Sequence, residues 1–65
     1  MSKRDYRQFA IMLGRLRSNY RSDESALAVL ETVEYEMCKV FSLDNPRFDA
    51  VRFHDAVMQA MAQEE

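Results

Sequence analysis

The sequence predicts an all-α domain of three short helices, and three observations carry that prediction. Its 65 residues include one glycine and one proline, whereas the helix-favouring Ala, Leu, Met, Glu, Gln and Arg are plentiful. Apolar residues recur at alternating steps of three and four along three segments, which is the spacing of one helix face. No segment shows the pattern of a competing strand. We therefore expect residues 1–65 to form a single three-helix domain, with helices at about 5–20, 23–42 and 50–62.

The first predicted helix, at about 5–20, carries one apolar stripe interrupted by a glycine. The stripe consists of Tyr6, Phe9, Leu13, Leu16 and Tyr20. Gly14 in its middle weakens an isolated helix by about 1 kcal/mol relative to alanine. Two interpretations are open: Gly14 lets another helix approach closely, or it lies harmlessly on the solvent side.

The second predicted helix, at about 23–42, follows a polar break. Ser22 is the expected N-cap, and Asp23 and Glu24 place negative charge in the first turn, where the helix dipole favours it. Its apolar stripe is Ala26, Leu30, Val33, Met37 and Val40, widened by Leu27, Val29 and Phe41.

The third predicted helix, at about 50–62, has the sharpest start signal. Asn45-Pro46 forms a turn, because proline fixes its own φ and biases the preceding residue away from the helical region. With Asp49 as N-cap, Phe48 and Phe53 have the spacing of a hydrophobic staple. The expected core of the three helices is Phe9, Leu13, Leu16, Leu30, Val33, Met37, Phe48, Phe53 and Val57.

A chain of this length needs a further source of stability. Small domains bury only about 60% of the surface that the unfolded chain exposes. Cys38 is the single cysteine, so no internal disulfide forms, and Cys38 with His54 cannot supply the four ligands of a structural zinc site. No metal or other cofactor is predicted. Oligomerisation or unusually good helix packing remains as the source of the additional stability.

Cys38 and His54 are also the only pair that could begin a nucleophilic site. No known catalytic motif surrounds either residue, so the sequence predicts that the protein is not an enzyme. A groove joining Cys38 to His54 is the feature that catalysis would require.

Apolar residues outside or beside the helix stripes favour self-association or a surface that binds a protein partner. They are Ile11, Met12, Val51, Met58 and Met61. Methionine is common at such surfaces because its side chain is adaptable.

Charge is distributed unevenly, although the formal net charge is −2. Residues 1–22 carry six basic side chains against one acid, and residues 23–65 carry three against ten. One interpretation is a nucleic-acid-binding surface on the first helix, formed by Arg4, Arg7 and Arg15. The other is pairing within the fold, with Arg15 and Arg17 near the acidic start of the second helix.

The stretch from Asn45 to Phe53 reads Asn-Pro-Arg-Phe-Asp-x-x-Arg-Phe, and Asp5-Tyr6 opens the first helix. These features resemble short uncharacterised proteins of bacteriophages and their hosts, and that resemblance implies a phage or mobile-element accessory protein. No segment approaches the roughly 18–20 apolar residues of a membrane span, and the first residues lack a signal-peptide pattern, so a cytoplasmic location is expected. The predicted function is non-enzymatic binding of a host or phage protein through helical apolar surface, as a homodimer. The alternative is a nucleic-acid-binding module.

Overall fold

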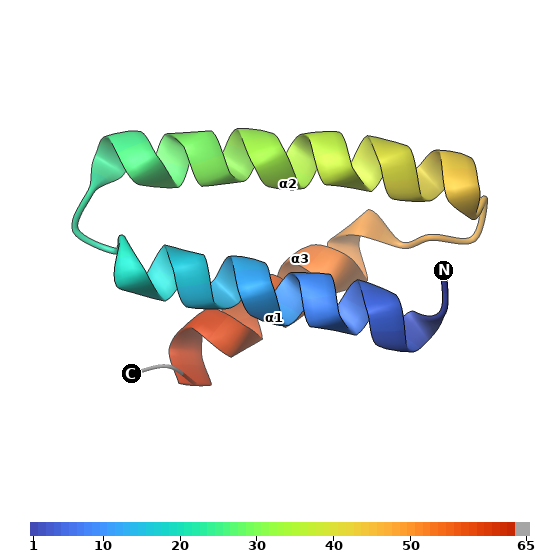
Figure 1. Ribbon diagram of the computed structural model, residues 1–65, viewed down its shortest axis with the longest axis horizontal. Helices are drawn as coiled ribbons and strands as arrows, with labels where there is room; N and C mark the ends of the chain where they lie inside the picture. Colours follow the sequence, from blue (N-terminus) through green and yellow to red (C-terminus); the bar gives the residue numbers. More distant parts are fainter. Residues whose placement is uncertain (64–65) are drawn as a thin grey trace.

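The computed structural model describes residues 1–63, which form α1 (Lys3–Asn19), α2 (Glu24–Asp44) and α3 (Ala50–Gln63). Helices α1 and α2 lie side by side in opposite directions, and α3 crosses α1 (Figure 1). The predicted all-α, three-helix fold is therefore confirmed. No helix within residues 1–63 has the length and apolar character needed to cross a membrane.

Local hydrogen bonds explain where α1 and α2 begin. Ser2 caps α1, because its Oγ accepts the Asp5 N–H at 3.3 Å while the Asp5 carboxylate accepts the Ser2 N–H at 3.0 Å. This capping box starts α1 two residues before the expected Asp5. The N-cap of α2 is Asp23 and not Ser22, because the Asp23 N–H still bonds back to the Tyr20 carbonyl at 2.8 Å. Ser22 therefore lies inside the turn.

The predicted start of α3 is confirmed. The Asp49 carboxylate accepts the N–H groups of Val51 and Arg52 at 3.0 and 3.1 Å. The rings of Phe48 and Phe53 lie 5.6 Å apart, so the hydrophobic staple forms. The staple sets the direction in which the chain enters α3.

Phe41 of α2 is the centre of an aromatic cluster that joins all three helices. Its ring centroid lies between 5.0 and 5.5 Å from those of Tyr6, Phe9, Phe48 and Phe53. Tilted and edge-on pairs at such distances add stability beyond the burial of apolar area. This cluster fixes the C-terminal part of α2 against α1 and the start of α3.

Helices α1 and α3 approach each other closely at Gly14. A Cβ atom at this position would lie 2.5 Å from the Ala60 Cβ and 2.6 Å from the Val57 carbonyl oxygen. Because these distances are shorter than van der Waals contact, only glycine fits. The first of the two interpretations of Gly14 is correct, and α3 is the helix that it admits.

Burial corrects the expected core at several positions. Leu13, Phe53 and Val57 are buried as predicted, whereas Val33 is 40% exposed and its prediction is wrong. Half-buried positions from the predicted core are Phe9, Leu16, Leu30, Met37 and Phe48. The buried residues of α2 are Glu34 and Phe41, each one residue after a member of the predicted stripe, Val33 or Val40. The face of α2 that packs inward is therefore rotated relative to the predicted one.

Candidate functional site

The outer face of α2 exposes an apolar line, which we call the outer stripe and define as Val29, Val33, Glu36, Val40 and Leu43. Its members follow one another at steps of four, three, four and three. Exposed fractions are 62% for Val29, 61% for Val40 and 88% for Leu43. Single exposed apolar residues are ordinary in folded proteins, whereas apolar residues aligned on one helix face, here interrupted by Glu36, are typical of interaction surfaces.

The spacing of the outer stripe is that of a coiled-coil seam. Val33 and Val40 take one of the two heptad core positions, and Val29, Glu36 and Leu43 take the other. Glu36 is the one polar member, and its carboxylate pairs with the Lys39 amine at 2.9 Å within the same helix. The sequence pattern assigned Val29, Val33 and Val40 to the inner stripe. The sequence does contain a signal for two separate faces of α2, because its apolar residues span a wider arc of the helix than one helix contact can cover.

The residues predicted to bind a partner are not gathered into one site. Met12, Val51 and Met58 are exposed, with exposed fractions of 44%, 71% and 40%. Ile11 and Met61 are half-buried, and Ile11 lines a groove between α1 and α3. Their role in partner binding stays a prediction.

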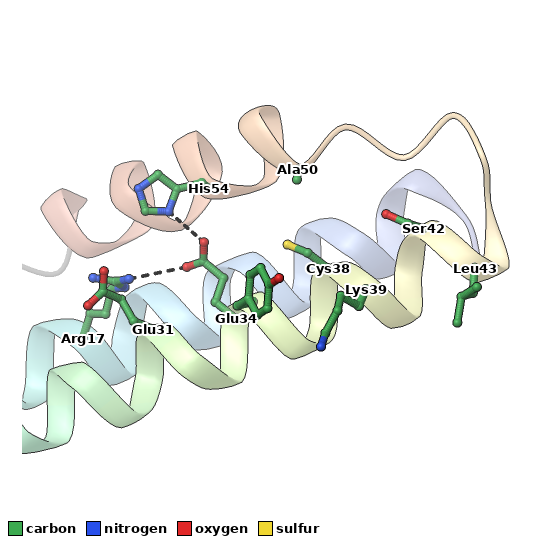
Figure 2. Close-up of a pocket in the computed structure, with 10 residues that line it drawn as sticks. Arg17, Glu31, Glu34, Cys38, Lys39, Ser42, Leu43, Ala50 and His54 are labelled. Atoms are coloured by element: carbon green, nitrogen blue, oxygen red, sulfur yellow. Dashed lines mark hydrogen bonds and ion pairs between the residues drawn. The ribbon is translucent and has the colours of Figure 1, made fainter.

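A polar cluster takes one side chain from each helix: buried Arg17 of α1, buried Glu34 of α2 and exposed His54 of α3 (Figure 2). One Glu34 oxygen lies 2.7 Å from His54 Nδ1, and the other lies 3.6 Å from a terminal nitrogen of Arg17. His54 Nδ1 donates this hydrogen bond in the tautomer that carries the proton on Nδ1. Arg17 and Glu34 are 9% and 8% exposed. The cluster therefore ties α2 to both other helices.

This cluster refines the prediction that the basic and acidic halves pair within the fold. Arg17 does pair with α2, but its partner is Glu34 in the middle of that helix and not the acidic start at Asp23 and Glu24. Replacing buried ion pairs with apolar residues is often neutral for stability, so this pair by itself is weak evidence for stabilisation of the fold. Arg4, Arg7 and Arg15 are exposed, and nucleic-acid binding by this set stays a prediction.

Cys38 and His54 line the same groove between α2 and α3, with Glu34 between them (Figure 2). The shared groove is the feature that catalysis by this pair would require. The chemistry is unfavourable, however, because burial and the nearby Glu34 carboxylate both raise the pKa of the Cys38 thiol. A nucleophilic cysteine needs a lowered pKa, and His54 directs Nδ1 to Glu34. Within residues 1–63, no three acidic, histidine or cysteine side chains gather to hold a metal ion.

The raised pKa of Cys38 predicts slow alkylation. Because the thiolate is the reactive form, iodoacetamide should modify folded Cys38 more slowly than the urea-unfolded chain near pH 8. The pH midpoint of the folded rate should lie above that of the unfolded chain, and Glu34→Gln should move it down. Mass spectrometry of the adduct over time measures both. Faster alkylation of the folded chain would contradict the prediction and revive a catalytic role for Cys38.

The fold and these sites define a small three-helix protein with a partly buried polar cluster and an exposed apolar stripe. Comparisons of the chain with protein-family models, with curated proteins and with solved structures find no significant match.

Proposed function

We propose that this chain is a non-enzymatic protein-interaction protein that binds its partner through the outer stripe of α2. The observation that carries the proposal is the exposure of Val29, Val40 and Leu43 along one line at coiled-coil spacing. The resemblance of residues 45–53 to short phage proteins supports a phage or mobile-element origin, and with it the cytoplasm of a host cell.

The partner that best fits the outer stripe is a second copy of the chain. From Val29 to Leu43 the stripe runs along about 21 Å of helix, at 1.5 Å per residue. An identical stripe matches it in length and in apolar character. Pairing buries both stripes, and burial of apolar surface contributes about 25 cal/mol of favourable free energy per Å². Glu36 lies midway between Val29 and Leu43, so alignment of the two stripes over their full length brings the two Glu36 carboxylates together in either direction, and their repulsion weakens the pair.

The test is the oligomeric state of stripe variants. Wild type should sediment as a dimer of twice 7.7 kDa at tens of micromolar. Val29→Glu with Val40→Glu should be monomeric, because each buries a carboxylate in an apolar seam. Ala28→Glu adds one such charge at an exposed α2 position outside the stripe and should stay dimeric. Glu36→Leu should tighten the dimer.

Two outcomes would contradict self-association. One is a wild-type monomer at tens of micromolar, and the other is dissociation by Ala28→Glu as complete as that by the stripe pair. If wild type is monomeric, capture of a host protein that is lost in the stripe variant and kept in Ala28→Glu would place a different protein on the same surface. Circular dichroism of each variant shows whether its helices are intact.

A further inference from the structure

A groove of about 750 Å³ between α1 and α3 gathers basic side chains from three segments. Lys3 and Arg7 come from the start of α1, Arg47 from the connection, and Arg52 from the first turn of α3. Among the described residues that line the groove, Asp49 is the one acid. This concentration of positive charge is not a consequence of composition, because the chain carries a formal net charge of −2.

The positive charge of the groove is poorly neutralised. Asp49 already accepts two backbone N–H groups as the cap of α3. Its other oxygen lies 3.7 Å from Arg52 Nε, and the Arg52 side chain is 88% exposed, so water screens this pair strongly. The four cations are therefore available to an anionic ligand.

The arrangement matches a chain of phosphates better than a single anion. The cations come from three separate segments around a shallow groove and do not converge on one buried point. One guanidinium group can donate hydrogen bonds to two phosphate oxygens at once. Half-buried Tyr6 and Phe48, with ring centroids 5.1 Å apart, also line the groove. Positive grooves with aromatic side chains are the pattern of sequence-tolerant binding to single strands.

We propose that the groove between α1 and α3 is a binding site for single-stranded nucleic acid, held through phosphate contacts from Lys3, Arg7, Arg47 and Arg52. The site is separate from the outer stripe, which belongs to α2 alone. It also differs from the set Arg4, Arg7 and Arg15 expected on the first helix, because only Arg7 of those three lines the groove. Substitutions in the two sets are therefore expected to change the affinity for nucleic acid differently.

The experiment measures fluorescence anisotropy of a labelled oligothymidylate titrated with the full chain. Four phosphate contacts predict a log–log salt slope of about −2.8, so affinity should fall on the order of 50-fold between about 50 and 200 mM salt. Arg47→Gln with Arg52→Gln should weaken binding about tenfold at the lower salt and reduce the slope by about 1.4. Arg4→Gln with Arg15→Gln removes the same charge outside the groove and should change affinity less than about threefold.

Each contrary result would overturn the proposal. Absence of binding at the lower salt would do so, as would equal losses in the two double variants, which would show a response to net charge alone. Duplex DNA bound more tightly than the single strand would refute the assignment of a single strand. Displacement of the oligonucleotide by polyglutamate at equal charge concentration would refute nucleic acid as the ligand. Circular dichroism establishes that both double variants are folded.

Discussion

Replacing Gly14 with alanine is expected to destabilise the domain by about 3 kcal/mol, and valine is expected to unfold it. In an exposed helix the alanine substitution would stabilise by about 1 kcal/mol, so the sign of the effect is informative. At this position the new Cβ would lie 2.6 Å from the Val57 carbonyl oxygen and 2.8 Å from the Met61 amide nitrogen. Both are backbone atoms, so α1 and α3 must separate to admit it. Urea denaturation followed by circular dichroism measures the free energy of unfolding.

The matched control for Gly14→Ala is a double variant with Ala60→Gly. It removes the shortest of the three contacts, the 2.5 Å approach to the Ala60 Cβ, and leaves the two backbone contacts in place. The loss in the double variant should therefore be smaller than the sum of the two single losses, as expected for residues in contact. A Gly14→Ala variant as stable as wild type would show that α1 and α3 do not pack through this position.

Phe53→Ala is expected to cost about 3–5 kcal/mol, as for other large-to-small changes at buried aromatic positions. Phe53 is 5% exposed, and its ring packs against Phe41 at 5.5 Å and Phe48 at 5.6 Å. The substitution removes the staple of α3 and opens a cavity beside Phe41. Because a domain of this length has only about 3–10 kcal/mol of stability, this loss should lower the melting temperature by more than about 10 °C. Thermal denaturation followed at the helical circular dichroism signal measures the change.

Val51→Ala is the control for Phe53→Ala, because it shortens a neighbouring side chain in the same helix turn. Val51 is 71% exposed, and alanine favours helix more than valine does, so this variant should melt at or slightly above the wild-type temperature. If Phe53→Ala melted like Val51→Ala, the aromatic cluster would not be the core of the fold.

Local signals in the sequence predicted the three helices and the entry into α3. The cap at Asp49 and the staple of Phe48 on Phe53 depend on residues that are close along the chain, so they could be assigned without a structure. The same reasoning missed the capping box of Ser2 and Asp5, although its two residues were readable at the required spacing. It also placed the cap of α2 one residue early, because Ser22 and Asp23 are both good caps and only the turn geometry separates them.

The candidate sites depend on residues that are far apart in the sequence. The polar cluster joins Arg17, Glu34 and His54, and the basic groove joins the start of α1 to Arg47 and Arg52. No periodicity in a single segment predicts such groupings, because they require the crossing of α1 and α3 and the rotation of α2 about its own axis. The outer stripe became visible only once the inward direction of Phe41 was known.

The sequence by itself determined the helix content, the staple and the shortage of stabilising features in a small chain. These follow from short-range physics, since propensity, capping and apolar spacing act within one or two helix turns. The tertiary structure alone decided that Gly14 admits α3, that Val33 faces outward and that four cations share one groove. The apolar arc of α2 is wide enough to pack in more than one orientation. The fit of Phe41 among the other aromatic rings selects the orientation that leaves the outer stripe in water.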